Sequence, residues 1–449
     1  MADDGARRRE QLREIFAAAL AAVAPDAAVT RHVRLTHDGT RLEAGGRAWD
    51  LTRARVRVVG AGKGAAPMAL ALEKLLGPHI VEGFVVVKYG HELPLGHITV
   101  AQAAHPVPDA AGVAAAARIL DIARRCAPGD LLVCLLTGGA SALTAAPAPG
   151  LTLADLQGTT NLLLQCGATI DEINAVRKHL SSIGGGQLAE AANGADVLGI
   201  IVSDVVGDAL DVIASGPTSP DPTTFFQCLE ILERFRILDQ VPGPARARLE
   251  AGAAGSVPET PKPGDPLFEH VRNVLAATNR QALEAAAARA EALGMEARIL
   301  TDSLTGEARD VAAALVAEAR RVAAALEPGA RPVCLLAGGE TTVTLTGDGL
   351  GGRNQEMALA AALELEGVAG ISAIFAGTDG TDGPTDAAGG FADAGSVGRM
   401  GGREAARAFL RKNASNRALV LAGDILITGP TRTNVMDLAL LVVEAPGRS

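Results

Sequence analysis

The sequence predicts an α/β protein of two domains, each a mainly parallel sheet covered by helices, the first of them Rossmann-like. Short apolar runs rich in β-branched residues alternate with alanine-rich stretches of helical spacing, a pattern typical of strands buried on both faces. The 449 residues also exceed the roughly 250–300 that one hydrophobic core serves. A segment dense in Pro and Gly divides the alternation, so we place domains at 1–240 and 265–449, joined by a connection at 241–264.

The elements follow from periodicity. Apolar residues at helical spacing over residues 7–24 predict an amphipathic helix. Continuous apolar runs predict strands in the first block at Val56–Val59, Phe84–Val87, Leu131–Leu136 and Val197–Val202. In the second block they predict strands at Val274–Ala277, Ala297–Leu300, Val333–Leu336, Ile371–Phe375, Ile425–Thr428 and Leu438–Val443, and a helix at Ala308–Leu326.

Composition excludes several classes of protein. The net charge of −10 and an aromatic content of 2% argue against nucleic-acid binding, which calls for basic patches and stacking platforms. No apolar run reaches the roughly 18 residues of a membrane span, and the first residues lack the apolar core of a signal peptide. The five widely spaced cysteines predict reduced, buried thiols. We expect a cytoplasmic enzyme acting on a small molecule, its assembly left open with a homodimer as one option.

Glycine-rich turns follow several predicted strands. Such turns, leading into helices, expose backbone N–H groups that hold phosphate. Gly138, Gly139 and Ser141 follow the run Leu131–Leu136, and they are candidates for the nucleotide side of a site. Further candidate turns lie at Ser182–Gly186 and Ala337–Thr341.

The turn Gly60–Ala65 fits the dinucleotide pattern G-x-G-x-x-G/A. A nicotinamide cofactor also calls for an acid about 20 residues on, at the end of the next strand, where this chain has Lys88. Lys63, inside the loop, suits an anion better than a nicotinamide, with a solvated loop lysine as the alternative. His91 and His105 also follow strands, and for them a structural role is the favoured interpretation.

Charged side chains gather after strands of both blocks. Arg353 follows two glycines at a predicted helix start, where a guanidinium grips phosphate or carboxylate in bidentate fashion; the alternative is an ion pair with a neighbouring acid. Asp204, Asp379 and Asp382 offer the hard oxygen ligands that Mg²⁺ prefers, against the alternative of solvated loops. Together these groups predict phosphoryl transfer, although the P-loop and protein-kinase motifs are missing from the sequence.

The chain closely resembles the class II glycerate 2-kinases, which carry a C-terminal MOFRL element and some of which are labelled hydroxypyruvate reductases. The resemblance spans about residues 10–445 and rests on the motifs VVGAGKGA (58–65), VVVKYGHE (85–92), HPVPD (105–109), TGGASAL (137–143), EINAVRKHLSSIGGG (172–186), SDVVGDALDVIASGPT (203–218), GGETTVTLTGDGLGGRNQE (338–356), GTDGTDGPTDAAGG (377–390) and TGPTRTNVMDLALLVV (428–443).

The resemblance implies transfer of the γ-phosphoryl group of ATP, with Mg²⁺, to the 2-hydroxyl of D-glycerate, in a cleft between two α/β domains. Lys63 and Arg353 match the family's proposed catalytic Lys and Arg. From its loop position we add Asp204, as hydroxyl activator or metal ligand. The range Asn174–Lys178, and within it Asn174 and Lys178, supplies further nucleotide candidates.

One position departs from the family pattern. Gly184 stands where family members usually have lysine, which removes a cation from a likely turn for anions. Two alternatives stay open beside the kinase. One is an NAD(P)H-dependent hydroxypyruvate reductase, indicated by Gly60–Ala65; the other is a silent nucleotide-binding protein, indicated by Gly184.

Overall fold

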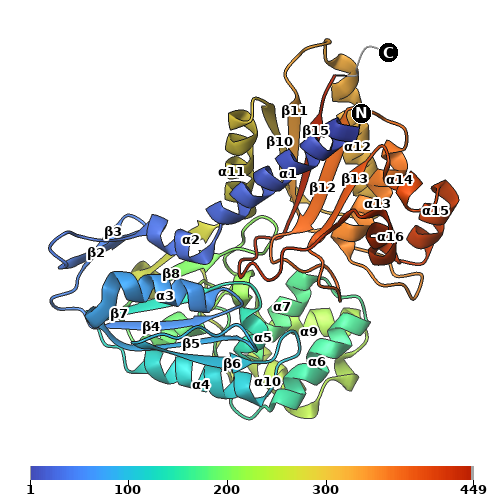
Figure 1. Ribbon diagram of the computed structural model, residues 1–449. Coiled ribbons are helices and arrows are strands. Elements are labelled where there is room, and N and C mark those ends of the chain that lie inside the picture. Colours follow the sequence, from blue (N-terminus) through green and yellow to red (C-terminus); the bar gives the residue numbers. More distant parts are fainter. Residues whose placement is uncertain (1, 446–449) are drawn as a thin grey trace. The chain divides into compact units, whose positions relative to one another are not determined.

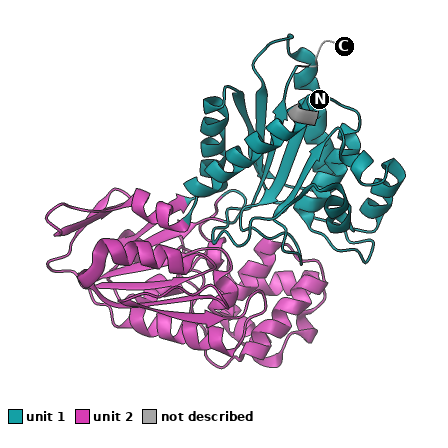
Figure 2. Cartoon of the chain, viewed as in Figure 1, with its two compact units in different colours: residues 1–24, 204–207, 277–449 teal, residues 25–203, 208–276 magenta. Residues whose placement is uncertain are grey.

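The computed structural model describes residues 2–445, which divide into two compact units (Figure 2). Unit 1 comprises Met1–Ala24, Asp204–Gly207 and Ala277–Ser449, and unit 2 comprises Pro25–Ser203 and Asp208–Ala276. This corrects the predicted domains, because the first helix belongs with the C-terminal part of the chain. The predicted connection 241–264 lies within unit 2 and contains helix α10 (Gly243–Ala253). Its Ala245 and Leu249, four residues apart, are fully buried, so this segment is part of a core.

Unit 2 is built on a six-stranded sheet in the order β6-β5-β4-β7-β8-β9. Counted along the chain this is 3-2-1-4-5-6, the order of dinucleotide-binding folds, and the pairs that join β6 to β8 are parallel. The Rossmann-like expectation is therefore confirmed. The strands are β4 (Val56–Ala61), β5 (Ile80–Lys88), β6 (Ile98–Ala103), β7 (Leu131–Leu136), β8 (Asp196–Val202) and β9 (Val271–Ala277).

Helices cover both faces of this sheet. Helix α3 (Ala65–Leu76) lies on one face and α4 (Ala110–Arg124) on the other (Figure 1). The short helices of unit 2 are α2 (Pro25–His32), α5 (Ala140–Leu143) and α8 (Gln187–Ala191). A small antiparallel sheet, which the sequence analysis did not predict, is formed by β1 (Val33–Leu35), β2 (Arg41–Ala44) and β3 (Arg47–Asp50).

Unit 2 also contains a helical region with a core of its own, which was likewise not predicted. It consists of α6 (Leu153–Gln165), α7 (Ile170–His179), α9 (Phe225–Arg234) and α10. Three of these helices begin at threonine capping boxes, in which Thr152, Thr169 and Thr224 accept a backbone N–H while a side chain three residues on bonds back to the cap. These caps fix where α6, α7 and α9 start.

Unit 1 contains a mixed six-stranded sheet in the order β10-β11-β15-β12-β13-β14. Strands β10 and β11 run parallel, but the other four neighbouring pairs are antiparallel. The prediction of a mainly parallel second sheet was therefore wrong. Continuous apolar runs report burial on both faces and do not report strand direction. The strands are β10 (Glu296–Leu304), β11 (Val333–Gly339), β12 (Ile371–Gly377), β13 (Gly389–Asp393), β14 (Ile425–Leu426) and β15 (Asp437–Val443).

Helices cover this sheet on both faces as well (Figure 1). The predicted amphipathic helix is α1 (Ala2–Ala22), which packs with α11 (Asn279–Ala292) on one face. On the other face, α12 (Ala308–Ala325) and α13 (Arg353–Leu365) share a core with β11, β12 and β15. Three short helices complete the unit: α14 (Ser396–Arg399), α15 (Arg403–Arg411) and α16 (Ser415–Ala422). Within residues 2–445 no helix is long and apolar enough to cross a membrane.

Candidate active site

The carboxyl ends of β4 and β7 mark the point in unit 2 where the strand order reverses. In open α/β sheets ligands bind at this point, because the loops on either side diverge and leave a crevice. Two turns meet here. The Lys63 N–H donates to the Gly138 carbonyl at 3.0 Å, and the Gly64 N–H donates to Thr137 Oγ1 at 3.0 Å. The turn that carries Lys63 is thus bound to the glycine turn after β7.

Gly62 allows these two turns to come so close. Its φ is +128°, and a Cβ built on it would lie 2.1 Å from Thr137 Oγ1 and 2.5 Å from the Thr137 carbonyl oxygen. Any side chain would therefore push the turns apart. The sequence analysis compared the glycines at Gly60–Ala65 with a dinucleotide-binding pattern. In the structure, Gly62 lets the turn that carries Lys63 pack against Thr137.

Two histidines lie beside Lys63. Gly139 has a φ of +87°, and a Cβ built on it would come within 3.1 Å of His105 Nε2 and 3.7 Å of Lys63 Cγ. His91 Nδ1 lies 3.4 Å from the Lys63 carbonyl oxygen. The ammonium-bearing side chain, both imidazoles and the predicted glycine turn are therefore gathered at one edge of the sheet.

Ser141 lies two residues after Gly139, in the short helix α5. Its hydroxyl is 2.9 Å from that of Ser215, and both residues line a pocket of about 490 Å³. Of the predicted nucleotide residues, Gly138, Gly139 and Ser141 thus occur together at the switch point of the sheet.

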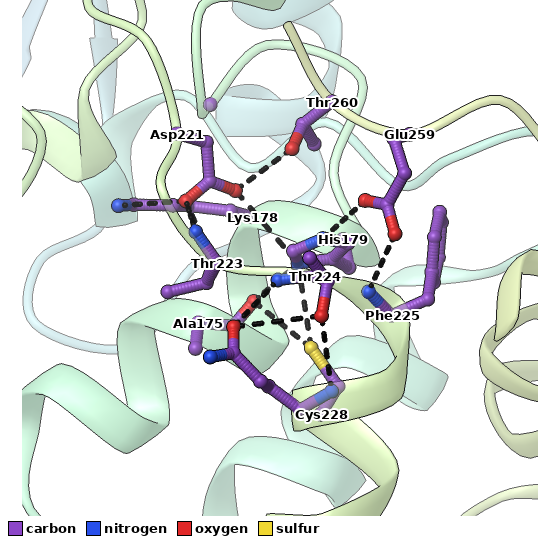
Figure 3. A network of polar contacts seen from close by, with 12 residues as sticks. Ala175, Lys178, His179, Asp221, Thr223, Thr224, Phe225, Cys228, Glu259 and Thr260 are labelled. Atoms are coloured by element: carbon purple, nitrogen blue, oxygen red, sulfur yellow. Dashed lines mark hydrogen bonds and ion pairs between the residues drawn. The ribbon is translucent and has the colours of Figure 1, made fainter. Parts of the chain in front are cut away.

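The other two predicted nucleotide residues, Asn174 and Lys178, are buried on α7. The Lys178 ammonium lies 3.2 Å from Asp211 Oδ2 and 3.4 Å from Asp221 Oδ1. Asp221 is fully buried and also accepts hydrogen bonds from Thr223 and Thr260 (Figure 3). Burial opposes the charge on Asp221, but Lys178 and the hydrogen bonds hold its pKa below the ordinary value. Lys178 therefore anchors α7 to the loop after β8, and its charge is already balanced within the protein.

The network extends to the next residue of α7. His179 Nε2 lies 3.1 Å from Glu259 Oε2, and its Nδ1 lies 3.3 Å from Cys228 Sγ (Figure 3). Burial raises the pKa of the Cys228 thiol far above its usual range, so this sulfur stays protonated. The interactions drawn in Figure 3 therefore join α7 to α9 and to the segments around Asp221 and Glu259.

In unit 1, Arg353 is the first residue of α13 and is bound by two acids. Its Nε and Nη2 donate to the two oxygens of Asp437, at 2.5 and 3.0 Å, and its Nη1 donates to Glu340 at 2.6 Å. Glu340 follows β11 and Asp437 opens β15, which runs antiparallel, so both reach the same sheet edge. The ion-pair alternative for Arg353 is thus observed, and three of its five N–H donors are in use.

Negative charge exceeds positive charge around this guanidinium. Burial raises the pKa of Glu340, and the charges of Asp437 and Asp379 raise it further against the opposing effect of Arg353. Burial disfavours a charged Arg353, yet its two acidic partners hold the pKa of the guanidinium above its ordinary value. The carboxylates of Asp437, Glu340 and Asp382 thus act on one guanidinium, so acidic groups outnumber the cation at this edge.

The two predicted metal ligands have different surroundings. Asp382 is buried, and its carboxylate accepts the backbone N–H groups of Asn354 and Gln355 at 3.1 and 2.8 Å, together with the amides of both side chains. It caps the start of α13, so its oxygens are committed to the helix. Asp379 follows β12 and accepts from the Thr381 backbone and hydroxyl, each at 3.0 Å through one oxygen. Within the described part of the chain, no cluster of three His, Cys, Asp or Glu side chains is arranged for a metal.

Asp204 belongs to unit 1, although residues on either side of its short loop belong to unit 2. Its Oδ2 accepts from the Asn434 side-chain amide at 3.3 Å. Asn434 lies in the segment that leads to Asp437. Asp204 is therefore associated with the chain just before β15.

Sequence reasoning missed Glu340 and Asp437 as partners of Arg353, and it did not single out Arg177 within the nucleotide candidates at Asn174–Lys178. Glu340 carried a usable signal, because it directly follows an apolar run and two glycines. Asp437 begins an apolar run, and only the antiparallel direction of β15 brings it to the edge where β11 ends. Arg177 is described below.

Comparisons with known proteins agree on one family. Residues 11–250 match a domain family described as being of unknown function, DUF4147, and residues 333–437 match the MOFRL family. A glycerate 2-kinase of Pyrococcus horikoshii is 40% identical over 429 residues, covering 95% of each chain. A protein of Agrobacterium vitis with the provisional name of hydroxypyruvate reductase is 41% identical, covering 97% of this chain and 94% of its own. The crystal structure of a glycerate kinase (EC 2.7.1.31) from Thermotoga maritima superposes with a TM-score of 0.85 at 38% identity, covering 98% of this chain and 100% of that one.

Proposed function

This chain belongs to the glycerate kinase family that joins a DUF4147 region to a MOFRL region, and on that premise we propose that it is a glycerate 2-kinase. The reaction transfers the γ-phosphoryl group of ATP to the 2-hydroxyl of D-glycerate and yields 2-phosphoglycerate and ADP. We expect the protein in the cytoplasm. A homodimeric assembly stays a prediction from the sequence.

The observation that carries this proposal is the position of Lys63. It precedes α3 at the switch point of a Rossmann-ordered sheet, hydrogen-bonded to the glycine turn after β7. Ligands bind in the crevice at such a point, and an ammonium beside it is suited to hold the oxygens of a phosphate chain. Lys63 is thus assigned to the transferring phosphoryl group, and Gly138, Gly139 and Ser141 to the phosphates behind it.

The groups assigned to the acceptor lie in unit 1. In the reaction the 2-hydroxyl oxygen attacks the γ-phosphorus, the bond to the β-phosphate oxygen breaks, and the hydroxyl proton goes to a base. Asp204 is assigned as that base. Arg353 has two N–H donors beyond those bound to Asp437 and Glu340, and they are assigned to the glycerate carboxylate or the γ-phosphate.

The charge around Arg353 fits a divalent cation. Mg²⁺ binds through one or two carboxylates together with substrate phosphates, so a cluster of three protein ligands is not required. Asp379 and Glu340 are the carboxylates assigned to it, whereas Asp382, as the cap of α13, is now a weaker candidate. When bound, the cation would offset negative charge on the phosphate oxygens.

A second function, NAD(P)H-dependent reduction of hydroxypyruvate, is indicated by the Gly60–Ala65 turn and by the name of the Agrobacterium relative. The residue at the end of β5 argues against the reductase function. That position is Lys88, whereas ribose recognition by a Rossmann fold uses an acid there. An ammonium offers no acceptor for a ribose hydroxyl.

Two assays on the purified protein separate these functions. With ATP, Mg²⁺ and D-glycerate, the kinase releases ADP in proportion to glycerate, and reactions without glycerate or without Mg²⁺ give the background. With hydroxypyruvate and NADH or NADPH, we expect no oxidation of the coenzyme above background. Coenzyme oxidation without glycerate-dependent ADP release would reverse the assignment.

A further inference from the structure

The pocket of about 490 Å³ in unit 2 has a guanidinium in its wall. Helices α6 and α7, the loop Pro106–Pro108 and the pair Ser141–Ser215 surround it. This volume lies within the roughly 300–1,000 Å³ typical of small-molecule sites. The pocket thus extends from the Ser141–Ser215 pair to the helical region of the unit.

Arg177, on α7, lines this pocket and has no acidic partner among residues 2–445. It differs in this from the adjacent Lys178, whose charge is balanced by Asp211 and Asp221. Burial alone lowers the pKa of Arg177, and no carboxylate counteracts that effect. A charge held in the protein without a counterion is costly, which indicates that an anionic ligand completes the site.

The rest of the pocket wall is suited to a flat apolar group. Val107, Leu164 and Ile170 line the pocket with side chains that are 64%, 60% and 60% exposed. Large apolar side chains exposed together around a concavity mark a binding site. A ligand that pairs with Arg177 and covers these three residues combines an anionic group with an apolar surface, as a nucleotide does with its phosphate and the face of its base.

The backbone at the inner end of the pocket is strained. Ala214 and Ser215 are consecutive non-glycine residues with φ of +55° and +61°, and both line the pocket. Such conformations persist where surrounding structure enforces them, and they cluster at binding sites. Here they place the Ser215 hydroxyl against Ser141, two residues after Gly139, which lies beside the Lys63 side chain.

We propose that this pocket binds the nucleoside part of a purine nucleotide, with the base against Val107, Leu164 and Ile170 and with Arg177 paired to the phosphate next to the ribose. Ser141 then lies where the phosphate chain continues towards Lys63. The inference rests on the proposed kinase function and names the subsite for its phosphoryl donor. The proposal also places the positive charge of Arg177 in the same pocket wall as Gly184, where family members usually have lysine.

Calorimetric titration of the full chain with ADP tests the proposal without requiring turnover. We compare the wild type with Arg177→Gln, Arg177→Lys and the control Arg41→Gln, which removes an exposed arginine of the same unit. Loss of a charged hydrogen bond predicts ADP binding weakened about 10- to 100-fold in Arg177→Gln. Arg177→Lys is expected to recover part of the affinity, and Arg41→Gln all of it.

Thermal unfolding separates a binding role from a structural one. Because Arg177 has no acidic partner to lose within the part of the chain that the structure describes, Arg177→Gln without ligand should melt at or above the wild-type temperature. The stabilisation that ADP gives the wild type should be reduced in this variant. A purely structural arginine would instead lower the melting temperature of the protein without ligand.

The outcomes distinguish this proposal from the proposed function. If Arg177→Gln binds ADP as tightly as the wild type, or if the wild type binds no nucleotide, the pocket assignment is wrong. If inorganic phosphate competes with ADP as well as adenosine monophosphate does, the apolar wall contributes nothing and the nucleoside assignment also fails. If ADP binding depends on Arg177 but glycerate is not phosphorylated, the pocket stands and the kinase function falls.

Discussion

Replacing Gly62 with alanine probes the contact that positions Lys63. An added Cβ would lie 2.1 Å from Thr137 Oγ1, and ordinary contact begins at 3.4 Å, so the two turns must separate by about 1.3 Å. We expect a cost of about 1–3 kcal/mol from the backbone conformation and about 1–3 kcal/mol from crowding. A displacement of this size at a reacting group lowers the rate by about 100-fold.

Gly39→Ala is the matched control. Gly39 also has a positive φ, +70°, but nothing lies within 4 Å of its built Cβ. This variant therefore carries a conformational cost of about 1–2 kcal/mol without crowding. Steady-state kinetics with ATP and D-glycerate should show kcat/KM reduced about 100-fold in Gly62→Ala and within about twofold of wild type in Gly39→Ala. Equal activities in the two variants would refute the argument that the meeting of the β4 and β7 turns forms the site.

Three further predictions concern single charges. Lys63→Ala should lower kcat/KM by about 100- to 1,000-fold. The turn itself should stay in place, because the bonds that join it to the turn after β7 use the main chain of residue 63. A near-normal rate would remove Lys63 from the mechanism. Arg353→Ala should lower both kcat/KM and the free energy of unfolding, because the largely buried Asp437 loses its partner. Arg353→Lys should restore stability more than activity, because an ammonium cannot bind in bidentate fashion. An Arg353→Lys enzyme of full activity would contradict the bidentate role. Asp221→Asn should cost about 3–5 kcal/mol at neutral pH, because it leaves Lys178 with one counterion fewer in the core. The pKa of Asp221 is lowered on folding, so the contribution of this carboxylate to stability is complete above the ordinary pKa of 3.8 and is lost as the pH falls below that value. Urea unfolding should therefore show the stability difference between wild type and Asp221→Asn shrinking in acid. A difference independent of pH would contradict the ion pair.

The sequence predicted the strands better than it predicted how they assemble. Each apolar run interpreted as a strand overlaps a strand of the structure, since such runs report burial directly. Strand direction depends on the connections, so the antiparallel β15 in the second sheet was not foreseen. The segment 241–264 was misread because its prolines and glycines masked the four-residue spacing of Ala245 and Leu249.

The sequence predicted those site residues whose positions follow from the strand that precedes them. Lys63 and Gly139 lie in turns after parallel strands, and the sheet rule places such turns at one edge. On α7, neighbouring cations differ in a way that the sequence conceals. Lys178 meets acids brought from the loop after β8, whereas Arg177, one residue earlier, points to a different environment and lines a pocket. Such a distinction depends on tertiary contacts.

The position of the phosphoryl group on the product tests the account most directly. Enolase acts on 2-phosphoglycerate and requires a mutase before it can use 3-phosphoglycerate. The reaction mixture of this protein with ATP, Mg²⁺ and D-glycerate, treated with enolase alone, should therefore form phosphoenolpyruvate in proportion to the ADP released. Phosphoenolpyruvate that appears only after a phosphoglycerate mutase is added would contradict transfer to the 2-hydroxyl.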